Sequence, residues 1–190
     1  MKKILMCATL ACMPLIARAE YAPVADQWNY YISANVGAFV SDVKIKDDTF
    51  FDFGGGANFE FGGKYNKYRV AFALQNRAEV SELIQILVGH TISIENIALR
   101  LNGYYDYVSG KNFAMYVGGG VGINRYDYTI QERITNITES KHGASFTGGI
   151  NTGMIFSFWH LGIDLGFAID YVSYPQIVSY GPTIGLRYNF

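Results

Sequence analysis

Cysteine is missing from most of this 190-residue chain, because Cys7 and Cys12 are the only two and both lie near the start. A chain cleaved after residue 19 would have no disulfide, no thiolate nucleophile and no cysteine metal site. The remainder also has no run of about eighteen apolar residues, the length that a membrane-spanning helix needs. Any segment that crosses a membrane would therefore have to be a strand.

The first 19 residues predict a secretory signal peptide. Lys2 and Lys3 form a basic start, residues 4–16 are mainly apolar, and Ala17-Arg18-Ala19 fits the small-x-small cleavage pattern. We expect cleavage before Glu20. The predicted domain organisation is a signal peptide over residues 1–19 and one domain over residues 20–190.

An excess of positive charge is also missing. Without Lys2, Lys3 and Arg18, the chain keeps 12 basic and 16 acidic residues, a net charge of −4. This balance argues against a nucleic-acid partner. Glycine is abundant at 21 residues, tyrosine and phenylalanine together number 28, and proline is scarce at four.

Alternation of apolar and polar residues fills the rest of the chain. In the last segment Ile184, Leu186 and Tyr188 alternate with Gly185 and Arg187, as in a strand with two unlike faces. The same pattern predicts eight strands, over residues 30–41, 50–62, 68–79, 95–107, 113–126, 144–157, 160–172 and 178–190. Each is long enough to cross a membrane at a tilt, and the number is even.

The expected connections alternate between short and long. Residues 63–67, 108–112 and 158–159 are short turns, whereas 42–49, 80–94, 127–143 and 173–177 are longer. This asymmetry is typical of outer-membrane barrels, which have short periplasmic turns and longer extracellular loops. A change of parity between Ile94 and Ile97 predicts a bulge or a loop end near Glu95-Asn96.

The polar side of the predicted strands indicates a cramped interior. It contains glycine, alanine, serine, asparagine and aspartate, with arginine and no lysine, whereas an exposed strand face would avoid glycine. Small residues suit the interior of an eight-stranded barrel, and arginine suits paired carboxylates. We expect an inward, mutually neutralised network of Asp52, Glu60, Arg69, Arg77, Arg100, Asp106, Asp164, Asp170 and Arg187.

The apolar side is expected to face lipid. Aromatic residues gather at its two ends, as amphipathic rings do at the two lipid–water boundaries. The expected periplasmic girdle is Trp28, Tyr30, Tyr105, Tyr107, Phe113, Phe158, Trp159, Tyr188 and Phe190, and the outer one Phe50, Tyr171, Tyr174 and Tyr180. The alternative is a soluble, lipocalin-like barrel with its apolar side chains inside. The predicted fold class is an all-β, eight-stranded, antiparallel transmembrane β-barrel with a cleaved signal peptide.

Two segments resemble a known family. Tyr104-Tyr105-Asp106-Tyr107, a short turn and Tyr116-Val117-Gly118-Gly119-Gly120-Val121-Gly122 are similar to segments of the small OmpA-like, opacity-type outer-membrane barrels. The resemblance implies location in the outer membrane of a Gram-negative cell, among lipid and lipopolysaccharide. It also implies insertion by the barrel-assembly machinery, which would read Tyr188 and Phe190 as its signal.

The expected function is that of a non-enzymatic surface protein whose outer loops contact host-surface, matrix or envelope molecules. The segments at 126–130 and 133–138 favour strands, so the longest loop is expected to continue as a hairpin above the membrane. Its exposed edge could bind a partner by strand addition. The candidate contact residues are Tyr128, Ile130, Ile134 and Ile137. A mobile antigenic loop is the equal alternative.

Two other functions are open from the residues. A narrow porin-like channel is one, although eight strands ordinarily leave no continuous pore. A lipid-modifying enzyme is the other, with His90 and His142 at the outer rim, where Glu79 or Glu139 could join them on a metal ion. We expect neither catalysis nor a cofactor nor a bound metal, because surface histidines are common.

Overall fold

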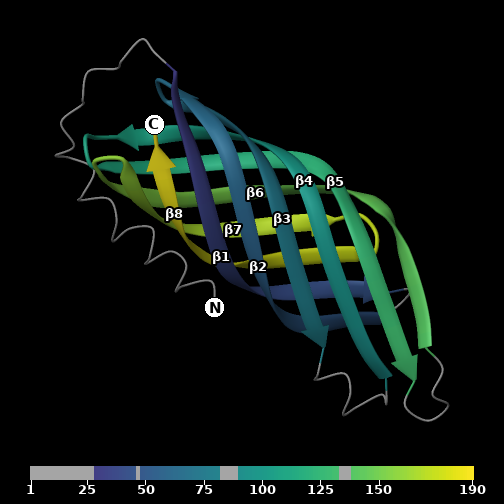
Figure 1. The fold of residues 1–190 in the computed structure, drawn as a ribbon. Coiled ribbons are helices and arrows are strands. Elements are labelled where there is room, and N and C mark those ends of the chain that lie inside the picture. The colour runs from purple at the N-terminus through teal and green to yellow at the C-terminus, as the bar shows by residue number, and fades with distance from the viewer. Residues whose placement is uncertain (1–27, 46–47, 82–89, 133–137) are drawn as a thin grey trace.

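A computed structural model describes residues 28–45, 48–81, 90–132 and 138–190, with only the backbone described for some residues near the strand ends. It contains eight strands (Figure 1). Their bounds are β1 Asn29–Ile45, β2 Asp48–Tyr65, β3 Tyr68–Ser81, β4 His90–Ser109, β5 Phe113–Glu132, β6 Thr138–Phe158, β7 Leu161–Val172 and β8 Gln176–Asn189. No helix in the part of the chain that the structure describes is long and apolar enough to span a membrane.

The eight strands form one closed antiparallel barrel. Each strand pairs with its neighbour in sequence, and β1 also pairs with β8, so the sheet has no free edge in the barrel wall. The predicted fold is confirmed. Seven strands are longer than predicted and β7 is one residue shorter; β4 begins at His90 instead of Glu95, and β6 begins at Thr138 instead of Ala144.

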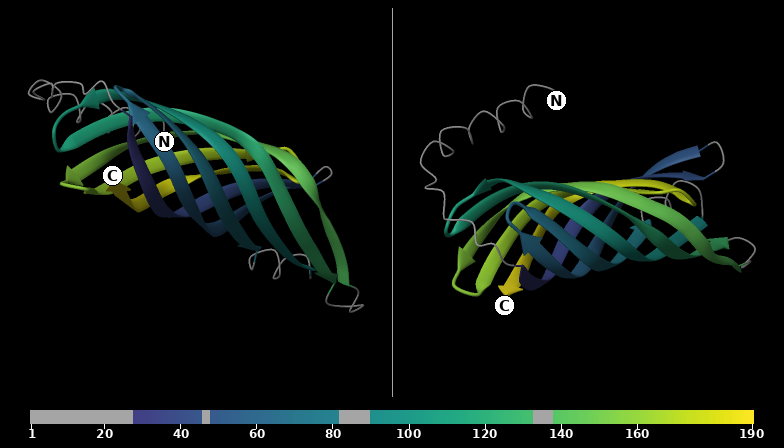
Figure 2. Two further views of the ribbon diagram at one scale, coloured as in Figure 1. Left: turned by 45° about the horizontal axis from the view of Figure 1, so that its top comes forward. Right: turned by 90° about the horizontal axis from the view of Figure 1, so that it is seen from above.

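The two ends of the barrel differ, as Figures 1 and 2 show. At one end, here called the terminal end, β1 begins and the chain finishes at Phe190, whose N–H donates to the Tyr30 carbonyl at 2.9 Å. Its turns are short, and two of them contain a residue with positive φ, Asn66 and Trp159. At the opposite end, the loop end, β4, β5 and β6 project farthest in Figure 1 and in the left view of Figure 2, and the right view of Figure 2 shows the β1–β2 hairpin projecting as well.

The predicted bulge is in the wrong place. Pairing of β4 with β3 and with β5 runs through Glu95 and Asn96 without interruption. The register between β4 and β5 shifts instead between Asp106 and Val108, near the terminal end. The change in apolar alternation near residue 95 therefore marks the height at which β4 extends beyond the apolar part of the wall. There the backbone hydrogen bonds continue, although the side chains no longer alternate between apolar and polar.

Exposure alternates along the strands and sorts the side chains into two faces. The apolar side chains point outward: Phe53 is 64% exposed, and Phe72, Leu99 and Ile123 are exposed as well. The polar and charged side chains point inward, and Arg69 is only 1% exposed. An outer wall covered by large apolar side chains is unfavourable in water and favourable in a lipid bilayer.

Candidate functional site

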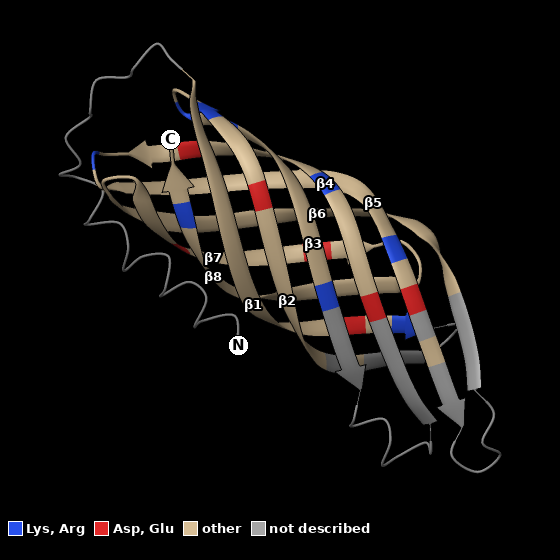
Figure 3. Ribbon diagram, viewed as in Figure 1, with Lys and Arg blue, Asp and Glu red and all other residues tan. Residues whose placement is uncertain are grey.

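The barrel interior contains a stack of charged and aromatic side chains, and Figure 3 shows positions of both signs at several heights. Nearest the terminal end, Arg69 on β3 donates through Nε to Asp106 Oδ1 on β4 at 2.9 Å. Lys64 Nζ lies 2.7 Å from the other oxygen of Asp106. Lys64 corrects the expectation that the polar face has no lysine, because β2 extends to Tyr65 and carries this residue inward.

Arg69 also lies between two tyrosine rings. Its guanidinium carbon is 4.7 Å from the centre of the Tyr104 ring and 4.6 Å from that of Tyr116, and the two rings meet edge to face. A desolvated arginine over aromatic faces gains cation–π attraction in addition to its ion pair. These contacts close the interior at this level.

A second ion pair joins β7 and β8. Arg187 Nη2 lies 3.1 Å from Asp164 Oδ2, and the Tyr116 hydroxyl donates to Asp164 Oδ1 at 2.8 Å. The Arg187 guanidinium lies 4.3 Å from the centre of the Tyr31 ring. Both oxygens of this buried carboxylate are therefore satisfied by donors from other strands.

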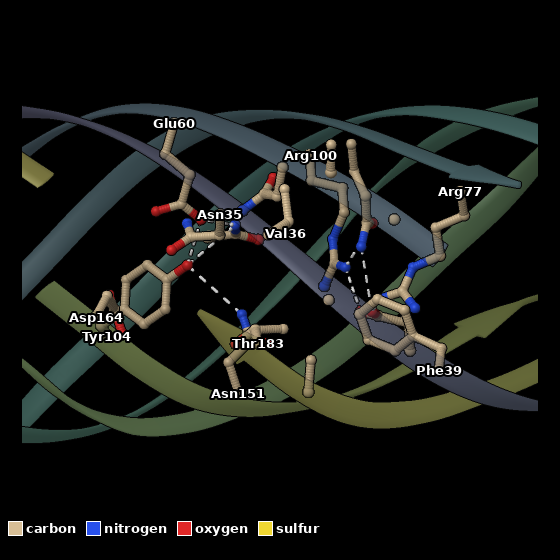
Figure 4. A pocket seen from close by; sticks show the side chains of 18 of the residues that line it. Asn35, Val36, Phe39, Glu60, Arg77, Arg100, Tyr104, Asn151, Asp164 and Thr183 are labelled. Carbon is tan, nitrogen blue, oxygen red and sulfur yellow. Dashed lines mark hydrogen bonds and ion pairs between the residues drawn. The ribbon is translucent and has the colours of Figure 1, made fainter. Parts of the chain in front are cut away.

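Glu60 on β2 is 2% exposed and has no lysine or arginine within ion-pair distance among the described residues. Its Oε1 accepts from the Tyr104 hydroxyl at 2.5 Å and from the side-chain amides of Asn102 at 2.9 Å and Asn58 at 3.0 Å. Figure 4 shows Glu60 and Tyr104 pointing toward each other across the cavity. Neutral donors thus stabilise a carboxylate that the sequence had assigned to an ion pair.

Toward the loop end, Asp170 on β7 receives two arginines. Arg77 and Arg100, from β3 and β4, each form an ion pair with it, and Gln75 donates to its Oδ2 at 3.2 Å. Arg77 stacks on the Phe39 ring with its guanidinium carbon 3.5 Å from the ring centre, as Figure 4 shows. This group connects four strands across the interior.

Little space remains between these layers. A cavity of about 50 Å³ lies between Glu60 and the Asp170 group, and another of about 10 Å³ lies nearer the loop end. The larger cavity could hold a few water molecules, because one water needs about 10–15 Å³ of cavity volume. Glycines in β5 make room for the layers, since a Cβ at Gly118 would overlap the Tyr104 ring and one at Gly120 would overlap Asn102. The glycine-rich segment is therefore a packing feature of the wall.

Other predicted residues lie outside this interior group or outside the described residues. Asp52 pairs with Ser41 in the β1–β2 ladder, but its side chain is not among those described. Tyr128 and Ile130 lie in β5, with their side chains likewise outside the described set, and Ile134 and Ile137 fall in the undescribed range 133–137. Tyr188 and Phe190 are exposed at the terminal end, with ring centres 5.3 Å apart.

The structure describes the side chains of two histidines, His142 and His160. Among the described side chains, no group of three or more His, Cys, Asp and Glu could hold a metal ion. The side chains of His90, Glu79 and Glu139 are outside that set, so the alternative of a metal ion held by His90 or His142 with Glu79 or Glu139 falls outside the described residues. His160 lies at the terminal end, with Nδ1 2.9 Å from the Asn189 carbonyl.

Sequence reasoning missed the interior tyrosines Tyr31, Tyr104 and Tyr116. Parity could have found all three, because Tyr31 alternates in phase with Ser33, Tyr104 with Asn102 and Asp106, and Tyr116 with Gly118. None of the three was assigned to either face, although a tyrosine hydroxyl suits an interior that offers carboxylate partners.

A second candidate site is the edge of the projecting sheet at the loop end. The β6–β7 ladder begins at Thr147, so in the described part of the chain residues 138–145 of β6 pair with β5 alone. At the start of the shared ladder, the N–H of Ser173 donates to the Phe146 carbonyl at 2.9 Å, and the Phe146 N–H donates to the Ser173 hydroxyl at 3.0 Å. The backbone groups of Phe146 thus point away from β5.

Comparison with known proteins decides the family. Residues 8–190 match the family described as outer membrane protein beta-barrel domain. The chain belongs to this family. Its apolar wall is therefore the surface that faces the lipid of an outer membrane.

Solved structures agree with this fold at low sequence identity. Neisserial surface protein A shares 14% identity with a TM-score of 0.65, over 89% of this chain and 100% of that one. Ail, the attachment invasion locus protein of Yersinia pestis, shares 15% identity with a TM-score of 0.57, over 84% and 98%. A major outer membrane protein of Thermus thermophilus shares 12% with a TM-score of 0.57, over 86% and 99%. No curated protein sequence matches the chain.

Proposed function

We propose that this protein is a non-enzymatic surface protein, in which the barrel is a rigid mount and the projecting β4–β6 sheet binds partners outside the cell. The observation that carries the proposal is the open β6 edge. The filled interior supports a mount over a channel, because the described cavities of about 50 and 10 Å³ are separated by ion-paired layers. The runner-up, a narrow porin-like channel, has no comparable observation in its favour.

The β6 edge offers a regular row of hydrogen-bonding groups. Backbone groups alternate in direction along a strand, and those of Phe146 point away from β5. Those of Ala144, His142, Ser140 and Thr138 point the same way, because the β5–β6 register has no shift over this stretch. Unpaired N–H and C=O groups in such a row accept an additional strand, with the main chain giving affinity.

The partner that fits this edge is an extended polypeptide segment of a host-surface or matrix protein. Strand addition needs a free backbone, which a polysaccharide lacks. One structure of Ail contains a heparin analogue, a polyanion. The loop-end segments of this chain, residues 42–49, 80–94, 127–143 and 173–177, contain seven acidic and four basic residues. This balance disfavours a polyanion.

The test is a proline placed on the open edge. His142→Pro removes an N–H that points away from β5, so the β5–β6 ladder and the barrel remain intact. The matched control, His142→Ala, removes the same side chain and keeps the N–H. The assay would measure binding of the folded full-length protein to immobilised laminin and fibronectin. Immobilised heparin would be included as a polyanion for comparison.

We expect binding to a matrix protein that His142→Pro abolishes and His142→Ala retains. Equal loss in both variants would assign the contact to the imidazole and overturn strand addition. Binding to heparin alone would overturn the polypeptide partner. Absence of binding to any surface or matrix protein, together with altered lipid A acyl chains on overexpression, would favour the enzyme.

A further inference from the structure

The lipid-facing wall of the barrel has a groove of about 720 Å³ over β5 to β8 and β1. On this wall the outward residues Ala38, Thr152 and Pro182 are small, whereas β2 carries Phe51, Phe53, Phe59 and Phe61 at its outward positions. The groove is hollow because these small side chains leave the strand backbone uncovered. It is lined mainly by apolar atoms.

The strand register gives the groove its direction. Its first row consists of residues that are partners across neighbouring strands, Met115, Met154, Leu165, Ile184 and Val36. The next row is Thr152, Phe167, Pro182 and Ala38. The groove therefore runs across the strands. It starts beside Tyr107 near the terminal end and finishes at mid-height of β1, where β1 and β8 meet.

The end of the groove at β1 lies at a break in the β1–β8 ladder. Pairing runs from Tyr31–Asn189 to Gly37–Thr183 and resumes at Val40–Tyr180, omitting the two pairs between. Pro182 has no N–H to donate to the Ala38 carbonyl. A Cβ at Gly181 would overlap the Ala38 carbonyl oxygen, so only glycine allows this approach. The backbone itself therefore fixes where the groove finishes.

We propose that this groove is a binding site for one acyl chain of a periplasmic-leaflet phospholipid. The groove opens on the face that meets lipid, and it begins at the level of the periplasmic aromatic girdle. Four strand spacings from β5 to β1 amount to about 19 Å. A chain inclined at about 45° across half of a 30 Å hydrocarbon core covers about 21 Å, so one chain matches the groove in length.

The lining suits a flexible hydrocarbon. Met115 and Met154 are partners in the β5–β6 ladder, and methionine adapts to irregular apolar neighbours. The hydroxyl of Thr152 donates to the Tyr116 carbonyl at 2.9 Å, so it does not require a polar ligand. A tail lying in the groove contacts more protein atoms than a tail on the smooth wall, and is retained longer than its neighbours.

The experiment is native mass spectrometry of the full-length folded protein released from vesicles of phosphatidylethanolamine and phosphatidylglycerol with 16-carbon chains. Ala38→Phe fills the groove where it finishes. Ala34→Phe adds the same ring to an outward, exposed position of the same strand that does not line the groove. Folding of each variant is checked by its heat-modifiable migration, and Met154→Phe is a second filling variant on another strand.

We expect one retained phospholipid per barrel in the natural protein and in Ala34→Phe. Retention should fall roughly tenfold or more in Ala38→Phe and Met154→Phe, a loss of about 1.4 kcal/mol or more. Equal retention in all four proteins would show ordinary annular lipid and overturn the site. No retained lipid in the natural protein would also overturn it, as would a dimer that the filling variants dissociate. The outcome is independent of the β6 edge, because the matrix-binding assay does not involve this wall.

Discussion

The Tyr104 hydroxyl on β4 donates to Glu60 Oε1 on β2 at 2.5 Å, across the intervening strand. The bond therefore joins two strands that share no backbone ladder, and it stabilises a buried carboxylate with a neutral donor. Interior contacts of this kind therefore connect strands that are not neighbours, in addition to the backbone ladder.

Replacing Tyr104 with phenylalanine should destabilise the barrel. The change removes a hydrogen bond to a charged acceptor, and we expect a loss of about 1.5–3 kcal/mol in the free energy of unfolding. Tyr105→Phe, at the next and outward-facing position, is the control and should change little. Urea unfolding in lipid vesicles provides the measurement. Equal effects of the two substitutions would refute the role given to this bond.

Asp170→Asn should be more harmful, because it leaves Arg77 and Arg100 buried against a neutral side chain. Breaking a buried ion pair by removing one partner costs about 3–5 kcal/mol. Asp127→Asn is the comparison, since Asp127 lies 3.6 Å from Arg125 in a pair whose side chains are 54% and 72% exposed. We expect less than about 1 kcal/mol there. If the two variants lost the same free energy of unfolding, the result would show that the Asp170 ion pairs are solvated like the exposed pair.

Planar-bilayer recordings of single barrels should be silent for the natural protein. The ion-paired layers around Asp106 and Asp170 cross the interior, and the cavities between and beyond them among the described residues measure about 50 and 10 Å³. Steady channels that disappear on substitution of Arg100 or Asp164 would instead establish a pore lined by these residues.

Phe190→Ala should lower the amount of folded protein in the outer membrane of cells while the isolated barrel keeps its stability. Phe190 is exposed, and its backbone N–H, which bonds to Tyr30, survives the substitution. Phe158→Ala, another exposed ring at the terminal end, is the control and should leave the yield unchanged. Surface abundance and in vitro unfolding would be compared for both. If Phe190→Ala gave a normal yield in cells, the assembly signal would have to lie elsewhere.

The fold was predictable because both faces of each membrane-level strand have a fixed environment. The alternation around Leu99 and Leu101 on β4, and the short turns between strands, were enough to predict eight strands and the outward apolar face. Beyond the membrane both faces of a strand meet water, so the alternation stops although the strand continues. That is why β4 was expected to begin at residue 95, and why a bulge was expected where the ladder is regular.

The partners inside the barrel were less predictable. Sequence parity indicated that Glu60, Arg77, Arg100 and Asp170 share the interior, but it could not show that two arginines would meet Asp170 and that Glu60 would meet Tyr104. Which side chains meet depends on the stagger between strands that face each other across the barrel. The position of a residue along its own strand does not determine that stagger.

The sequence by itself therefore determined which side of every membrane-level strand is polar, because a period of two places alternate residues on opposite faces. The tertiary structure alone decided which carboxylate meets which cation, where the outer wall is hollow and which strand edge is open. These depend on closure of the barrel, which fixes the register of all eight strands at once.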